Sequence, residues 1–203
     1  MATVLIVDDE VQFSGLARYH LELEGFEADE VQEAETAWRM FTSQPYDAAI
    51  VDITLHGPLD GWGLIRRLRS DGRFRAVPIV VMTGLDDPAL PDKAAELGCV
   101  YLSKDAIPEV AERLRDAIRA SLRAVRVVLL LPGYSVEGTL HLPMEPKRFS
   151  DAWEALIQSP AMFVALSDPV ISGSGTEGGT STGPVLEVRK DRILAVMPVE
   201  TSG

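Results

Sequence analysis

The chain has 203 residues, of which 46% are apolar and 25% are charged, a composition that suits one large folded domain or two small ones. Acidic residues outnumber basic residues by 31 to 19, and the net charge is -12. A charge of this sign disfavours broad binding to nucleic acid phosphates or to an anionic membrane surface, and it suits a cation or a basic partner.

Three features predict a cytoplasmic protein that does not insert into a membrane. The single Cys99 cannot form an internal disulfide, as is usual in a reducing compartment. The chain enters its first apolar run without a basic segment or a cleavage site, so we expect no signal peptide. Its longest aliphatic run, Val127–Leu131, is too short to span a bilayer.

Five short apolar runs, each typical of a buried strand, recur through the first part of the chain. They cover Val4–Val7, Glu27–Val31, Ala48–Val51, Val77–Met82 and Cys99–Leu102. Apolar residues at helical spacing lie between these runs, and a last helical pattern ends near Leu122. Strands that are apolar throughout and alternate with helices indicate an α/β fold, with a doubly wound parallel sheet of five strands covered on both faces.

The pattern changes after Leu122, so we expect one domain over residues 1–123 and a second over residues 124–203. Residues 125–131 and 136–142 read as strands, and residues 149–157 have helical spacing. A strand at Met162–Leu166 and a hairpin of Val185–Arg189 with Arg192–Val196 follow. This order predicts a small β-rich domain, such as a partly open barrel.

The segment 172–184 interrupts this second domain. It contains five Gly, three Ser and three Thr in 13 residues. Such a composition buries too little apolar surface to order itself, so we expect a mobile loop.

Polar residues follow four of the five strands of the first domain. Asp8 and Asp9 follow the first strand, Asp52 the third and Thr83 the fourth, and Lys104 comes two residues after the fifth. Because the carboxyl ends of parallel strands share one edge of the sheet, these side chains are expected to meet there. Carboxylates in such a group need a counterion, and Mg²⁺ prefers a few carboxylate oxygens and keeps waters that a phosphate can replace. A lysine and a hydroxyl beside them are suited to phosphoryl transfer.

Residues 1–123 resemble the receiver domain of bacterial two-component response regulators, a family with a flavodoxin-like fold. The matching segments are "LIVDDE", "AAIVDITLHGPLDGWGLIRRLR", "VPIVVMTG" and "ELGCVYLSKD". The loop "DITLHGPLDG" is longer than the commonest version in the family. The second domain has only a faint likeness to small bacterial β-rich domains, some of them Sm-like in outline.

The resemblance implies a phosphoacceptor and a metal site. Asp52 would accept a phosphoryl group from a sensor histidine kinase or a phosphotransfer protein. Asp8 and Asp9 would hold Mg²⁺ together with Asp52 and the backbone carbonyl of Thr54. Glu10 is expected to face solvent.

The resemblance also implies groups that sense the phosphoryl group. Lys104 would contact it, Thr83 would supply the switch hydroxyl, and Tyr101 occupies the aromatic position that turns inward on activation. Where the family usually has proline after the lysine, this chain has Asp105, which changes the loop before the last helix and adds a negative charge near Lys104.

The function that these residues predict is a signalling switch and not an enzyme, apart from phosphotransfer to itself and slow self-dephosphorylation. Phosphorylation of Asp52 would act through a protein partner or self-association of the second domain, and no DNA binding is expected because this domain has no basic stripe. The alternatives are an unphosphorylated docking scaffold, which Asp105 favours, and RNA binding by the second domain.

Overall fold

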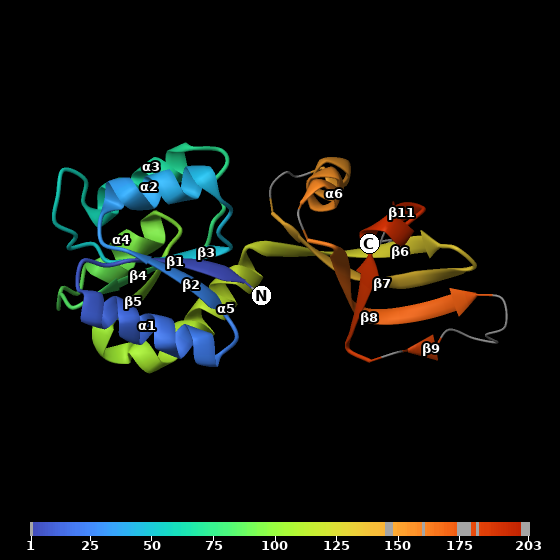
Figure 1. Ribbon diagram of the computed structural model, residues 1–203, viewed down its shortest axis with the longest axis horizontal. Helices are drawn as coiled ribbons and strands as arrows, with labels where there is room; N and C mark the ends of the chain where they lie inside the picture. The colour runs from blue at the N-terminus through green and yellow to red at the C-terminus, as the bar shows by residue number, and fades with distance from the viewer. Residues whose placement is uncertain (1, 145–147, 160, 174–179, 182, 200–203) are drawn as a thin grey trace. The chain divides into compact units, whose positions relative to one another are not determined.

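The structure, a computed structural model, describes residues 2–144, 148–159, 161–173, 180–181 and 183–199. The chain forms two compact units, Met1–Ser121 and Leu122–Gly203 (Figure 1). This division falls two residues before the boundary expected from the sequence, because Leu122 and Arg123 already belong to a strand of the second unit. Among the described residues, no helix is long and apolar enough to cross a membrane.

The first unit contains the predicted five-stranded parallel sheet. Its strands are β1 (Thr3–Val7), β2 (Glu27–Val31), β3 (Ala48–Val51), β4 (Ile79–Thr83) and β5 (Val100–Ser103). They lie in the order β2-β1-β3-β4-β5, and every neighbouring pair is parallel. The doubly wound fold expected from the sequence is therefore confirmed.

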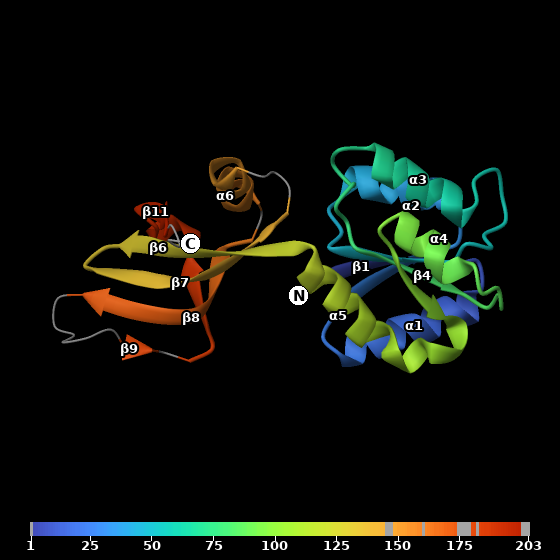
Figure 2. The ribbon, with the colours of Figure 1, turned by 180° about the vertical axis from the view of Figure 1, so that it is seen from behind.

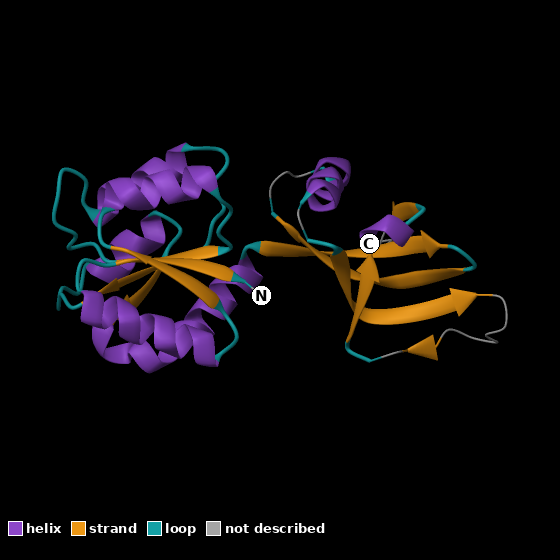
Figure 3. Cartoon of the chain, viewed as in Figure 1, coloured by secondary structure: helices purple, strands orange, loops and turns teal. Residues whose placement is uncertain are grey.

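Helices cover both faces of this sheet (Figures 1 and 3). They are α1 (Val11–Leu23), α2 (Ala34–Ser43), α3 (Gly61–Ser70), α4 (Leu90–Glu96), the short 3-10 helix η1 (Lys104–Glu109) and α5 (Val110–Ala120). One buried cluster joins the sheet to α2, α3 and α4, and the other joins it to α1 and α5. Because both faces are covered, β3 and β4 are buried at every position, which accounts for their continuous apolar sequence.

The second unit is an antiparallel sheet with one α-helix. Its elements are β6 (Leu122–Leu131), β7 (Tyr134–Pro143), α6 (Phe149–Gln158), β8 (Phe163–Gly173), β9 (Thr180–Ser181), β10 (Val185–Arg189), the 3-10 turn η2 (Lys190–Arg192) and β11 (Ala195–Pro198). The strand order is β10-β8-β7-β6-β11, with β9 paired to β8. Only one face is packed, around a cluster that includes Val127, Leu129 and Leu140, so β6 and β7 alternate in burial.

The expected hairpin of residues 185–189 with 192–196 is wrong. β10 pairs with β8, and β11 pairs with β6 at the opposite edge of the sheet. The turn η2 separates the two strands, and Lys190 fixes this turn to the end of α6 by donating to the backbone oxygens of Leu156 and Ser159. η2 thus follows one edge strand, β10, and leads to the strand at the opposite edge, β11, whereas a partly open barrel stays a prediction from the sequence.

The loop expected over residues 172–184 is only partly described. β8 continues through Gly173 and β9 covers residues 180–181. Residues 174–179 and 182 lie outside the described residues.

Candidate functional site

Two neighbouring strands bring two aspartates to the same edge of the sheet. β1 ends at Val7 and β3 at Val51, and the next residue of each strand is Asp8 or Asp52. The Asp52 amide donates to the Val7 carbonyl at 2.9 Å, so the backbones of the two segments stay paired up to the site. Asp8 is 2% exposed and Asp52 is 1% exposed. The sheet order therefore places two carboxylates together in a buried position.

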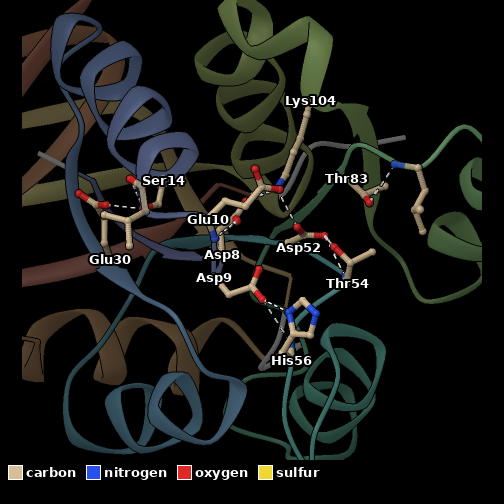
Figure 4. Close-up of polar contacts among 12 residues, drawn as sticks. Asp8, Asp9, Glu10, Ser14, Glu30, Asp52, Thr54, His56, Thr83 and Lys104 are labelled. Atoms are coloured by element: carbon tan, nitrogen blue, oxygen red, sulfur yellow. Dashed lines mark hydrogen bonds and ion pairs between the residues drawn. The ribbon is translucent and has the colours of Figure 1, made fainter.

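Lys104, the first residue of η1, lies between these carboxylates (Figure 4). Its Nζ is 2.8 Å from Asp8 Oδ2, 2.8 Å from Asp52 Oδ2 and 3.0 Å from Glu10 Oε1. The same ammonium lies 4.4 Å from the centre of the Phe13 ring on α1, a distance suited to a cation–π contact. One lysine thus contacts three carboxylates.

Burial and the carboxylates act in opposite directions on this lysine. Burial lowers the pKa of Lys104, but hydrogen bonds to Asp52, Asp8 and Glu10 outweigh it and leave the pKa raised. Lys104 therefore carries its positive charge at neutral pH. Burial also raises the pKa of Asp8, and the hydrogen bond from Lys104 only partly opposes that rise. A second cation would relieve this cost of keeping Asp8 ionised.

The donor set fits such a cation. Carboxylate oxygens of Asp8, Glu10 and Asp52 lie within 4.8 Å of one another. Three carboxylates against one ammonium leave an excess of negative charge, and two of the three are buried. Oxygen donors of this kind, with one side open to solvent at Glu10, suit Mg²⁺, which keeps several waters when bound.

Asp9 points away from this group of oxygens. Its carboxylate contacts the His56 ring and accepts the His56 backbone amide at 3.3 Å. The hydrogen bond from the His56 ring holds the pKa of Asp9 below its usual value, and Asp9 raises the pKa of His56. The structure thus places Asp9 beside His56, and its role as a metal ligand stays a prediction from the sequence.

Thr54 and Thr83 are both drawn on the side of Asp52 away from Asp8 in Figure 4. The Thr54 amide and hydroxyl both donate to Asp52 Oδ1, at 2.9 and 2.8 Å. Thr83 is fully buried at the end of β4, and its hydroxyl accepts the Leu85 amide at 3.3 Å. Tyr101 on β5 is half-buried and packs on the buried cluster that joins the sheet to α2, α3 and α4. None of these contacts tests the predicted switch roles.

The start of α3 fixes the backbone of Asp52. A Cβ atom on Gly61 would lie 2.0 Å from the Asp52 carbonyl oxygen, so only glycine fits at this position. Asp60 caps the helix by accepting the Gly63 amide at 2.6 Å. The segment "LDGWG" thereby holds the backbone of Asp52 in place from the α3 side.

Sequence reasoning missed three contacts of the site. Glu10 is exposed, as expected, but it also binds Lys104. His56 faces solvent yet contacts Asp9, and Phe13 lies against Lys104. The only signal for Glu10 was its place directly after the acidic pair. Asp105 is exposed on η1, where its amide donates to Ser103 Oγ at 3.3 Å.

Residues 4–119 match the family described as the response regulator receiver domain. Transcriptional activator protein IrlR of Burkholderia pseudomallei is 31% identical over 138 residues, which cover 67% of this chain and 58% of the relative. Transcriptional regulatory protein QseB of Haemophilus influenzae is 36% identical over 121 residues, or 59% of this chain and 53% of the relative. The chain thus spans little more than half the length of these curated relatives.

Solved structures of similar fold cover the first unit. A response regulator from Chloroflexus aurantiacus has a TM-score of 0.55 and 28% identity, and it matches 58% of this chain and 97% of its own. A Francisella response regulator receiver domain has a TM-score of 0.54 at 21% identity, covering 59% of this chain and 98% of its own. The second of these likenesses concerns the fold alone.

Proposed function

Because the chain belongs to the response regulator receiver family, we propose that Mg²⁺-dependent phosphorylation of Asp52 switches the interactions of its second unit. The phosphoryl group would come from a sensor histidine kinase or a phosphotransfer protein. The observation that carries this proposal is the position of Lys104, whose ammonium lies 2.8 Å from both Asp8 and Asp52.

The two oxygens of Asp52 have different surroundings. Oδ1 accepts two hydrogen bonds from Thr54, which fix the rotation of the carboxylate. Oδ2 faces Lys104. A phosphoryl group transferred to Oδ2 would bring its own oxygens to the Lys104 ammonium, so the lysine would exchange a carboxylate partner for a phosphoryl partner.

Asp8, Glu10 and Asp52 would hold Mg²⁺, with Asp9 a further ligand once it leaves His56. When bound, the ion neutralises negative charge on the phosphoryl oxygens during transfer. The protein groups orient the reaction: Thr54 fixes the acceptor carboxylate, Lys104 supplies a fixed positive charge, and Gly61 lets α3 pack directly on the Asp52 backbone.

We propose a phosphoacceptor and not an enzyme with a separate substrate. The output would run through a protein partner or self-association of the second unit. The names of the relatives mention transcription, but residues 124–203 hold nine acidic and six basic residues and an antiparallel sheet, so we propose no DNA contact for them. An unphosphorylated docking scaffold is the alternative.

The test is intact mass after incubation with acetyl phosphate and Mg²⁺. We expect a gain of about 80 Da, one phosphoryl group, which disappears with EDTA and in Asp52→Asn. Asp116→Asn, an exposed aspartate on α5, is the matched control and keeps the gain. Lys104→Gln is expected to retain folding but to lower the yield of phosphoprotein.

Absence of any mass gain, with the protein folded and Mg²⁺ saturating, would refute phosphorylation and support the scaffold. The output is tested separately. If phosphorylation leaves amide exchange in residues 122–199 and the sedimentation coefficient unchanged, the proposed switch of the second unit is wrong even though the receiver works.

A further inference from the structure

The packed face of the sheet in the second unit contacts α6 toward one end and holds a pocket toward the other. α6 follows the end of β7 at Pro143, and its Ala152, Trp153 and Leu156 pack on the core. The turn between β6 and β7 lies at the other end of these ten-residue strands. There a pocket of about 420 Å³ opens beside Tyr134. The volume is within the range of small-molecule sites.

The wall of this pocket is apolar and continuous with the core. Side chains from four strands form it: Leu131, Val136, Ile171, Leu186 and Val188. Val136 is fully buried and Val188 is 6% exposed, so both belong to the packed interior and not to a surface patch. The β6–β7 turn follows Leu131, which lines the pocket, and η2 contributes Arg192 to it, while Figure 2 shows β6, β7 and β8 side by side. The pocket is therefore a hollow beside the packed face of the sheet.

A guanidinium at the rim has no partner within the part of the chain that the structure describes. Arg192 lines the pocket from η2, and its side chain makes no ion pair or hydrogen bond with the described residues. The neighbouring Arg189 pairs with Asp191 at 2.9 Å, so its charge is already matched. The side chains of Glu187 and Arg189 point to the face opposite Val188, because strand residues alternate.

The edge of β10 adds backbone donors. The Lys190 amide donates to Met162 and the Asp168 amide to Pro184, both at 3.0 Å, so the even-numbered residues of this segment face β8. By alternation, the amides of Glu187 and Arg189 face the free edge of β10, where both residues border the pocket. These amides add hydrogen-bond donors to the border of the pocket, beside Arg192.

We propose that this pocket binds a small amphipathic carboxylate, with its aliphatic or aromatic body against Val136 and Val188 and its carboxylate at Arg192. An apolar wall favours burial of the body, and an unmatched guanidinium favours a carboxylate over a neutral or cationic head. The site lies wholly within the second unit, and its occupation does not depend on phosphorylation of Asp52.

The probe is decanoate, titrated into the full chain below its micelle concentration and followed by amide chemical shifts. Decanol and decyltrimethylammonium have the same chain with a neutral or a cationic head. We expect saturable shifts centred on Val136, Ile171 and Val188, with decanoate binding about tenfold tighter than decanol because of one charge-assisted contact. The cationic probe is expected to bind weakest.

Two variants test separately the contacts of the ligand's carboxylate and those of its apolar body. Arg192→Gln is expected to weaken decanoate about tenfold while leaving decanol unchanged, and Leu186→Trp, which fills the pocket, is expected to abolish both. Arg119→Gln, an arginine of α5 that is 73% exposed, is the control and leaves binding unchanged. No shifts at millimolar decanoate, or equal affinity for all three heads with no effect of Arg192→Gln, would overturn the proposal.

Discussion

The two sheets of this protein differ in how many faces they bury, and the difference explains where each carries its polar groups. The parallel sheet of the first unit is covered by helices on both faces, and its strands β3 and β4 are buried at every position. Charged residues that follow its strands gather at the carboxyl edge, at Asp8, Asp52 and Lys104, whereas the edge strand β2 carries exposed or half-buried carboxylates within the strand. The antiparallel sheet of the second unit packs on one face, and a pocket opens beside that face.

The largest expected effect tests this difference in burial directly. In β1, the neighbours Leu5 and Ile6 are both fully buried, so alanine at either position should lower the free energy of unfolding by about 3–4 kcal/mol. In β6, Leu129 is fully buried and Leu130 is half-buried, so alanine should cost about 3 kcal/mol at Leu129 but about 1 kcal/mol at Leu130. Denaturant unfolding, followed through amide signals of each unit, measures both pairs. Equal costs within the β6 pair would contradict one-sided packing.

Gly61→Ala is expected to have the next largest effect. The added Cβ would meet the Asp52 backbone, and we expect α3 to shift and the first unit to lose about 3 kcal/mol. Gly72→Ala is the matched control, since a Cβ there has no neighbour within 4 Å and no loss is expected. Thermal unfolding of the two variants is the measurement. Similar melting temperatures would mean that the first residue of α3 does not pack closely on the Asp52 backbone.

Removal of the Lys104 ammonium is expected to have a smaller effect on stability. Lys104→Gln leaves the buried Asp8 and Asp52 without their shared cation, and we expect a loss of about 2 kcal/mol in EDTA. Mg²⁺ should restore more stability to this variant than to the unchanged protein, because it relieves the same repulsion. Lys93→Gln, which removes a lysine over the Trp62 ring, should show no such difference in its response to Mg²⁺.

The smallest effect concerns a buried hydroxyl of the first unit. Tyr46 donates to Asp29 at 2.7 Å, and burial together with that contact raises its pKa from 10.0 to about 12. Tyr46→Phe should cost about 1 kcal/mol at neutral pH. Since the folded state holds the proton more tightly, the contribution of Tyr46 is complete below its unfolded pKa of 10.0 and is lost as the pH rises through about 12. The difference between the two proteins should therefore shrink over that range in denaturant titrations.

The sequence predicted the features that depend on neighbouring residues better than those that depend on residues far apart in the chain. All five parallel strands were expected, four of them because they are mainly apolar, whereas β2 reads EADEV and only Ala28 and Val31 in it are apolar. The helix α4 has seven residues, too few to show a clear period of its own. The pairing of β10 and β11 was mistaken because their true partners, β8 and β6, and the α6 residues that Lys190 contacts all lie far away in the sequence.

The same distinction holds for the candidate site. Asp8, Asp52 and Lys104 were expected together because each follows a strand of one sheet, and the structure brings them together. The contact of Asp9 with His56 depends on the conformation of a loop, which no spacing rule describes. The pocket of the second unit is formed by residues from four strands and a turn, so it became visible only once these strands were placed.

The hydrogen bonds from Lys190 to the end of α6 bear on how long the chain between them can be. Its ammonium contacts Ser159 and Leu156, which lie 31 and 34 positions before Lys190 in the sequence. Closing a loop of that size is an entropic cost that grows only with the logarithm of its length, so even doubling the intervening chain would cost about 0.6 kcal/mol. Insertions between β8 and β10 should therefore be tolerated, whereas a single deletion within η2 would move Lys190 off the helix end.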